Sequence, residues 1–361
     1  MKKGFWLITL LVNITFAQNY FETGHIGIKS DNFGGLSIYS PHMITRQIDR
    51  ISLLVSKDSM NVFDYMGDAG SVSQPNVVSS PEYGDYQLSV TIDNSYSNQQ
   101  PSVQAEISAF GWTGSSFILL RFNVTSKETA PFNSYLGLEI LPIINNSFGF
   151  EKVTLDHPQS IISINKKKFI GLRFLSNRVY SHKVIEWVAG YSKDKDFYQW
   201  LNSHKFDFTY NAGKDGSVIV TGIESILLQP NSTHSLWIAV ASADTLTDLN
   251  KSIDSASQKI PQIVTDFEDK EIIVEEFGLK QNYPNPFNPA TRIEFSLKED
   301  CRVNLTVCDI LGREVTTLIQ GEYSKGAYSV DFNGSSISSG IYIYRLTAGN
   351  LSFSKKMILL K

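Results

Sequence analysis

The sequence predicts an all-β protein in which a large antiparallel β-sandwich is followed by a small immunoglobulin-like β-sandwich. Hydrophobic and polar residues alternate along most of the chain, for example at Leu88, Val90 and Ile92, which is typical of half-buried strands. Only two segments have a helical spacing of apolar residues. A proline-rich stretch inside residues 278–297 separates a long front region from a compact C-terminal region. Together these observations predict the fold class and its division into two parts.

The first residues have the pattern of a secretory signal peptide. Met1-Lys2-Lys3 is basic, and it is followed by a mostly apolar run that is too short to span a membrane. Thr15 and Ala17 are small residues at the −3 and −1 positions of a cleavage site. We therefore expect residues 1–17 to be removed during export, so that the mature protein begins at Gln18.

The composition excludes several classes of partner and cofactor. The net charge is −4 and Lys166-Lys167-Lys168 is the only basic cluster, which gives no reason to expect nucleic acid binding. We interpret this triplet as a solvated turn between strands. The six histidines are scattered without metal-binding spacing, and no phosphate-cradling or dinucleotide-binding motif occurs. We therefore expect no metal and no cofactor.

Both cysteines, Cys301 and Cys308, lie in the C-terminal region. Seven residues along an extended strand span roughly 23 Å, whereas a disulfide needs Cα atoms within about 7 Å of each other. We therefore expect no disulfide between them. A catalytic cysteine in the front region is excluded.

The front domain, residues 18–260, is expected to be a large antiparallel β-sandwich. Residues 117–124 and 136–141 are apolar on both faces, which is typical of central strands in two packed sheets. Asp215-Gly216 is a turn signal, so we expect the alternating segments on either side of it to form a hairpin. The long paired strands faintly resemble the mutarotase-like supersandwiches of secreted carbohydrate-active proteins, although no motif carries that resemblance. The expected strands cover residues 88–92, 103–109, 117–124, 136–141, 169–175, 206–210, 218–223 and 234–241.

Two helices are expected in the front domain. Residues 195–203 fit a short helix that Asp194 caps. Thr245 and Asp248 have the spacing of a capping box at the start of a second helix. The apolar residues that should share one face of this second helix are Leu246, Leu249, Ile253 and Ala256.

Residues 261–276 are predicted to be an acidic linker. They contain six acidic side chains and one lysine, so the segment repels itself and should remain extended and exposed. Three prolines in residues 283–289 then remove backbone donors, which excludes that arm from a central strand. We expect Tyr283 and Phe287 to attach the arm to the C-terminal module.

The rest of the module, which we place at residues 277–361, has the pattern of about seven short strands. Residues 309–312 and Asn333-Gly334 are turn signals, and Gly312 is suited to a positive φ. Gly340 precedes another alternating strand. This pattern predicts a small immunoglobulin-like sandwich.

Four motifs in the module occur in a fixed order: YPNPFNPATRIEFSL, DILGREV, SSGIYIYRL and KKMILLK. Together they resemble the type A C-terminal sorting domain of the type IX secretion system. The resemblance covers about residues 277–361 and leaves the front domain unassigned. The motif residues are Asn282, Tyr283, Pro284, Asn285, Pro286, Phe287, Asn288, Pro289, Asp309, Gly312, Arg313, Gly340, Tyr342, Lys355 and Lys356.

The resemblance implies a route to the outside of the cell. Members of the family cross the outer membrane from the periplasm, and a surface protease then usually removes the domain. The implied partners are the type IX secretion machinery and its sorting protease. The implied location is the medium or the outer-membrane surface, in the second case with attachment to lipopolysaccharide.

Two functions remain open for the front domain. The first is a non-catalytic surface or secreted protein that binds glycan or has a structural role. Trp112, Trp187 and Trp200 are the candidates for stacking on sugar rings, although each could instead fill the core. The second is a polysaccharide-active hydrolase whose paired carboxylates come from distant strands and leave no local motif. The sequence identifies no catalytic residue.

Overall fold

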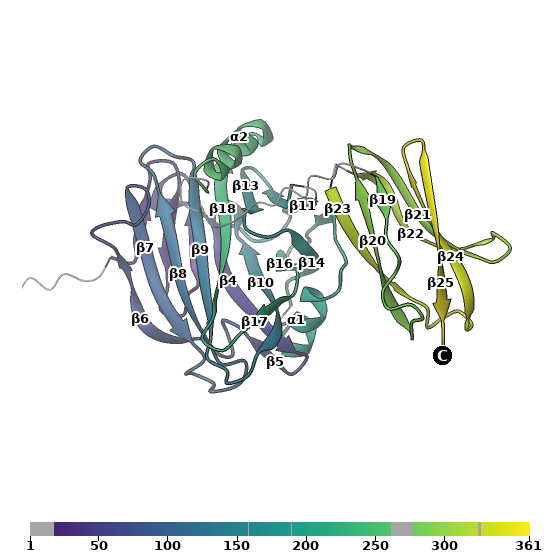
Figure 1. The fold of residues 1–361 in the computed structure, drawn as a ribbon. Coiled ribbons are helices and arrows are strands. Elements are labelled where there is room, and N and C mark those ends of the chain that lie inside the picture. The colour runs from purple at the N-terminus through teal and green to yellow at the C-terminus, as the bar shows by residue number, and fades with distance from the viewer. Residues whose placement is uncertain (1–17, 158, 189, 261–276, 324–325) are drawn as a thin grey trace, which may run out of the picture. The chain divides into compact units, whose positions relative to one another are not determined.

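The computed structural model describes residues 18–157, 159–188, 190–260, 277–323 and 326–361 (Figure 1). The chain separates into two compact units, a front unit within residues 18–260 and a C-terminal unit that follows Ile260. Antiparallel strands dominate both units, which confirms the predicted fold class. The predicted signal peptide and acidic linker lie outside the described residues. No helix in the described ranges is long and apolar enough to cross a membrane.

The front unit contains two nine-stranded sheets, which we call sheet A and sheet B. In sheet A, β5 (Asn61–Phe63) pairs with β4 (Arg46–Asp58), and β17 (Ile226–Leu228) pairs with β10 (Phe132–Pro142), outside the main strand order. The main order in sheet A is β1 (Tyr20–Glu22), β2 (Gly27–Ser30), β3 (Leu36–Tyr39), β4 (Arg46–Asp58), β10 (Phe132–Pro142), β16 (Ser217–Ile223) and β14 (Val179–Glu186). The order in sheet B is β15 (Thr209–Asn211), β11 (Lys152–Asp156), β12 (Ile161–Asn165), β13 (Phe169–Phe174), β18 (Thr233–Ala243), β9 (Phe117–Ser126), β8 (Val103–Gly111), β7 (Tyr86–Asp93) and β6 (Gly70–Val77).

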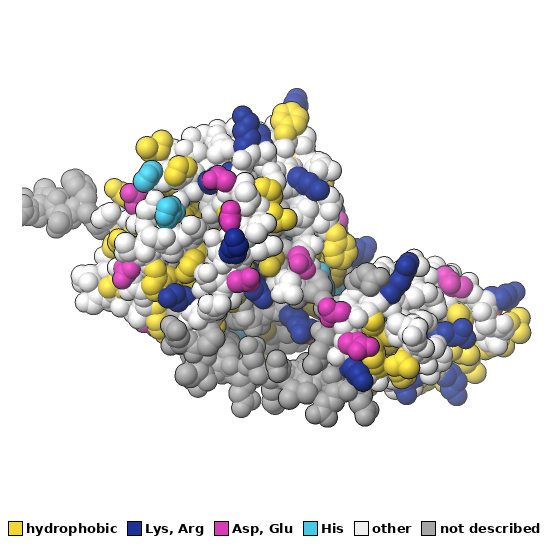
Figure 2. Space-filling view, turned by 90° about the horizontal axis from the view of Figure 1, so that it is seen from above, with side chains coloured by type: hydrophobic (Ala, Val, Ile, Leu, Met, Phe, Trp, Pro, Cys, Tyr) yellow, Lys and Arg dark blue, Asp and Glu magenta, His cyan; other side chains and the backbone are white. Residues whose placement is uncertain are grey.

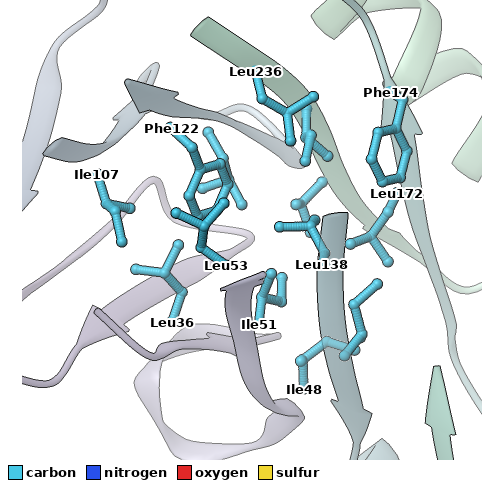
Figure 3. Close-up of a cluster of buried hydrophobic side chains, with 14 of the residues drawn as sticks. Leu36, Ile48, Ile51, Leu53, Ile107, Phe122, Leu138, Leu172, Phe174 and Leu236 are labelled. Carbon is cyan, nitrogen blue, oxygen red and sulfur yellow. The ribbon is translucent and has the colours of Figure 1, made fainter. Parts of the chain in front are cut away.

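The inward side chains of the two sheets form one hydrophobic core (Figure 3). Ile51 and Leu53 of β4 and Leu138 of β10 face Phe122 of β9 and Leu236 of β18. All five side chains are almost completely buried. Strands β9 and β10 are buried on both faces over most of their length, as the sequence predicted for central strands.

The α-helices α1 (Asp194–Leu201) and α2 (Leu246–Ser257) of the front unit lie on the outer faces of the sheets. The front unit also contains the short 3-10 helices η1 (His42–Ile44) and η2 (Ile144–Asn146). Leu201 of α1 (Asp194–Leu201) lies against Gly137 and Gly222 of sheet A. A Cβ atom on Gly137 would come within 2.4 Å of the Leu201 side chain, so the helix can approach only over glycine. In the same way, Ile253 of α2 (Leu246–Ser257) lies over Gly171 of sheet B.

The cap of α2 follows the prediction, whereas that of α1 does not. The Thr245 side-chain oxygen accepts a hydrogen bond from the Asp248 backbone N–H at 3.1 Å, although Leu246 is exposed rather than on the buried face. Asp194 is the first residue of α1 rather than its cap. Its carboxylate accepts the backbone N–H of Val62 in β5 at 3.1 Å, which ties the start of α1 to sheet A.

The expected hairpin around Asp215-Gly216 is wrong. Strand β15 pairs with β11 in sheet B, whereas β16 pairs with β10 and β14 in sheet A. The turn therefore carries the chain from one sheet to the other. Its backbone is bound by Glu151, whose carbonyl oxygen accepts from Ala212 N at 2.9 Å and whose carboxylate accepts from Ser217 N at 2.6 Å.

The C-terminal unit is a small sandwich of two antiparallel sheets with a core of its own. Both cysteines lie in β21 (Cys301–Asp309) and no disulfide joins them, in agreement with the prediction. One sheet has the order β19 (Gly278–Leu279), β20 (Ala290–Leu297) and β23 (Gly326–Asn333). The other has the order β22 (Glu314–Tyr323), β21 (Cys301–Asp309), β24 (Gly340–Ala348) and β25 (Leu351–Leu359).

Candidate functional site

The proline-rich arm is attached to the C-terminal unit through Asn282 and Phe287. The Asn282 backbone N–H donates to the Tyr344 hydroxyl at 2.8 Å, and its side-chain amide donates to Thr291 Oγ1 at 2.9 Å. Phe287 is buried, as predicted, against Phe332 with ring centroids 5.9 Å apart. The expectation for Tyr283 is wrong, since its side chain is 82% exposed. Because neighbouring residues of an extended chain face opposite sides, the burial of Asn282 turns Tyr283 outward.

The remaining arm residues contribute mainly backbone and amide contacts. The Asn285 side-chain oxygen accepts the Ile358 backbone N–H at 2.9 Å, and the Pro289 carbonyl accepts from Gly334 at 2.8 Å. The side chains of Pro284, Pro286, Asn288 and Pro289 are exposed. The motif therefore combines anchors with side chains that make no core contact.

The turn after β21 is closed by Asp309. Its carboxylate accepts the Leu311 and Arg313 backbone N–H groups at 2.9 and 3.0 Å, and Arg313 Nε donates to it at 2.7 Å. Gly312 has a φ of +78°, as the turn signal predicted. Further along the chain, Gly340 begins β24, the buried Tyr342 donates to Ser338 O at 2.7 Å, and Lys355 and Lys356 are half-buried and exposed, respectively.

The three candidate tryptophans lie in different surroundings. Trp112, in the β8–β9 connection, is half-buried against Phe117, and Lys259 Nζ lies 5.4 Å from its ring centroid. Trp200 is half-buried on α1 against Phe197. Trp187 directly follows β14 and is 45% exposed. In the described part of the chain, none of these three rings stacks on another.

Trp187 is joined by two exposed aromatic residues that the sequence reasoning did not identify, Phe148 and Phe150. The Trp187 N–H donates to Gly216 O and the Phe150 N–H donates to Gly213 O, both at 2.8 Å. The loops that carry the three aromatic residues therefore lie against the same turn. We call Phe148, Phe150 and Trp187 the aromatic rim.

Charged side chains fix the loops of the aromatic rim. Glu186 accepts the Gly213 N–H at 2.8 Å and lies within 3.3 Å of the Tyr210 hydroxyl, while Glu151 is buried against Ser217. Lys166, in the turn between β12 and β13, donates to the Phe148 carbonyl at 3.2 Å. The basic triplet thus lies in a turn, as predicted, and one member supports the rim.

A second polar group, also missed by the sequence reasoning, lies on the outer face of sheet A. Glu139 of β10 is 2% exposed, and its carboxylate accepts from Arg50 at 2.9 Å and from Ser52 at 2.8 Å. The Tyr191 hydroxyl donates a short hydrogen bond to the same carboxylate. The Arg50 guanidinium also lies 4.3 Å from the centroid of the Tyr65 ring. All charges in this group are paired.

Asp64, in the loop after β5, is a buried carboxyl group near Glu139 whose pKa is raised. The pKa of Asp64 is raised to about 6, mainly by burial and also by the charges of Asp68 and Glu139, against the effect of a hydrogen bond from the Gly67 N–H at 2.6 Å. An Asp with this pKa can hold a proton near neutral pH. Asp64 and Glu139 come from distant segments of the chain, so no spacing in the sequence identifies them as a pair.

His182 of β14 is buried inside the front unit. Burial lowers the pKa of His182 to about 4, and the ring is neutral, with Nδ1 2.8 Å from Thr221 Oγ1. Among the described residues, no three His, Cys, Asp or Glu side chains are grouped as metal ligands. Acidic and basic side chains are interspersed on the face of the molecule in Figure 2.

Comparison with known proteins identifies the C-terminal unit. Residues 281–360 match the family described as the secretion system C-terminal sorting domain, which confirms the resemblance to the type IX family for this part of the chain. No curated protein matches the chain.

Several solved structures have folds similar to large parts of this chain. A bacterial glucoamylase complexed with acarbose is similar with a TM-score of 0.52 and 10% identity, over 69% of this chain and 35% of that chain. This chain thus spans about a third of the glucoamylase, and the likeness concerns the fold alone. A putative aldose 1-epimerase from Escherichia coli K12 has a TM-score of 0.39 and 7% identity, over 63% of this chain and 98% of that chain. Heparan sulfate lyase HepC from Pedobacter heparinus has a TM-score of 0.34 and 9% identity, over 82% of this chain and 39% of that chain.

Proposed function

We propose that this protein is exported by the type IX secretion system and that its front unit binds glycan outside the cell. The sorting domain supports the export route, and the signal peptide pattern of residues 1–17 agrees with it because such proteins must first enter the periplasm. Cleavage between Ala17 and Gln18 starts the mature chain. A sorting protease then removes the C-terminal unit within residues 261–279, and the front unit is released or attached to lipopolysaccharide.

The aromatic rim is the observation that carries the glycan proposal. Sugar rings present apolar C–H faces that pack on aromatic rings, and Trp187 offers the largest such ring on a surface. The backbone bonds at Gly213 and Gly216 fix the loops beforehand, so binding costs little conformational entropy. Trp112 and Trp200 are half-buried against other rings, which favours a packing role for them.

The test is binding of the full chain to a panel of soluble polysaccharides, measured by calorimetry or by retarded migration in gels that contain the polysaccharide. We expect Trp187→Ala to weaken binding by about tenfold or more, which corresponds to about 1.4 kcal/mol. Tyr96→Ala is the matched control, because Tyr96 is an exposed aromatic residue in another loop. Equal binding by the wild type and Trp187→Ala would reject the rim as the site.

A second candidate function is hydrolysis of a polysaccharide, and Asp64 is the observation that favours it. Its raised pKa suits a general acid, and Glu139 provides a second carboxylate close enough to influence it. The paired state of Glu139 argues against a nucleophile, because its oxygens already accept from Arg50, Ser52 and Tyr191. Release of reducing ends by the wild type and not by Asp64→Asn would establish this activity.

A further inference from the structure

The outer face of the four-stranded sheet in the C-terminal unit carries apolar side chains that the fold does not use. Along β24, Tyr342 and Tyr344 point into the core, so alternation turns the exposed Ile341 and the half-buried Ile343 outward. Neither isoleucine belongs to the core of the unit or packs against it among the described residues. Ile341 is 46% exposed.

Strand register brings further apolar residues to the same place. Ile341 lies directly opposite Ile358 of β25, and opposed residues of antiparallel strands share a face. Asp309 lies opposite Tyr342, and Ile310 follows it in the turn at the same end of the sheet. Ile310 and Leu360 are both more than half exposed. We call Ile310, Ile341, Ile343, Ile358 and Leu360 the isoleucine face.

The border of the isoleucine face is cationic on the side of β25. Lys356 lies directly opposite Ile343, and Arg345 follows two residues further along β24. Both side chains are exposed. The carboxylate of Asp309 at the other end is already held by Arg313. A surface that fits this arrangement is apolar at its centre and has carboxylates at its edge.

We propose that the isoleucine face is the surface by which a protein of the secretion system recognises the sorting domain, and that this partner presents an apolar patch bordered by carboxylates. The inference rests on the proposed export function. The motifs DILGREV, SSGIYIYRL and KKMILLK each supply inward residues that build the core and outward residues that form this face. An apolar face outside the hydrophobic core, on a unit whose role is to be recognised, is suited to binding.

The experiment measures the fraction of full-length protein that a host with the secretion system delivers to the surface or medium. The double variant Ile341→Thr/Ile358→Thr keeps β-branched residues and removes apolar area, and we expect its export to fall about tenfold. We expect Lys356→Glu to reduce export as well. Leu351→Thr is the matched control, because Leu351 is an equally exposed apolar residue at the opposite end of β25, and it should be exported normally. Thermal unfolding should be unchanged in all variants.

The outcomes separate this inference from the export proposal. If removal of residues 277–361 blocks export while the double variant and Lys356→Glu are exported normally, the isoleucine face is not the recognised surface. If removal of residues 277–361 leaves export intact, the export function itself is wrong and the inference falls with it. Sedimentation that shows a dimer of the wild type and a monomer of the double variant would assign the face to a second copy of the chain and overturn the proposal.

Discussion

Asp64 is the residue whose titration should be visible in the stability of the whole front unit. The pKa of an aspartate side chain in an unfolded chain is about 3.9. Burial raises the pKa of Asp64 to about 6 in the folded protein. The folded state therefore holds the proton more tightly, and the free energy of unfolding should fall as the pH rises from about 4 to about 6. Above about pH 6 the contribution of Asp64 to the free energy of unfolding no longer changes with pH.

The substitution Asp64→Asn should remove this fall, because the amide does not ionise. We expect the variant to have a higher free energy of unfolding than the wild type at pH 7, by about 1–3 kcal/mol. Urea unfolding at pH 4 and pH 7 measures the difference. Asp215→Asn, at an exposed position, is the control and should keep the wild-type pH dependence. An unchanged pH dependence in Asp64→Asn would show that Asp64 does not titrate in this range.

At the scale of elements, the proline-rich arm depends on Asn282. Its buried side-chain amide donates to Thr291 Oγ1 and to the Pro284 carbonyl, at 2.9 and 3.1 Å. Asn282→Ala should destabilise the attachment of the arm by about 1–3 kcal/mol, because it leaves buried polar groups with fewer partners. Hydrogen exchange of the β20 amides in the full chain should then be faster. Asn288→Ala, at an exposed position, should leave the exchange unchanged; equal rates in both variants would contradict the anchoring role.

Local patterns predicted the elements better than their partners. Alternation identified β7 and β8, and a run that is apolar on both faces identified β9, because the burial of a strand's faces is encoded within the strand itself. The hairpin around Asp215-Gly216 was wrong because Glu151, far away in sequence, binds the turn. No local signal reports such a contact.

In the candidate sites, too, single residues could be predicted from the sequence, whereas their spatial neighbours could not. Trp187 was identified from its residue type, and its exposure is compatible with the prediction that it stacks on sugar. Phe148 and Phe150 were missed because only the contact of their loop with Gly213 places them beside it. Glu139 lies opposite Ser52 through the pairing of β4 with β10, which the sequence does not specify.

At the scale of the whole molecule, the front unit and the C-terminal unit each have a hydrophobic core, and the two cores share no residue. We therefore expect removal of residues 277–361 to leave the front unit folded, with its thermal transition unchanged. The sorting domain would then act in export and not in the folding of the front unit. Loss of the transition on truncation would show that the two units depend on each other.

The central claim is that residues 277–361 direct this protein through the type IX secretion system. Its most direct test is fractionation of a host that has the system, with the full chain compared with a chain that ends at Glu276. The account predicts that the full chain reaches the surface or medium and that intact mass shows a product that starts at Gln18 and ends within residues 261–279. The truncated chain should be folded and remain in the periplasm. Delivery of the truncated chain to the surface or medium at the level of the full chain would contradict the claim.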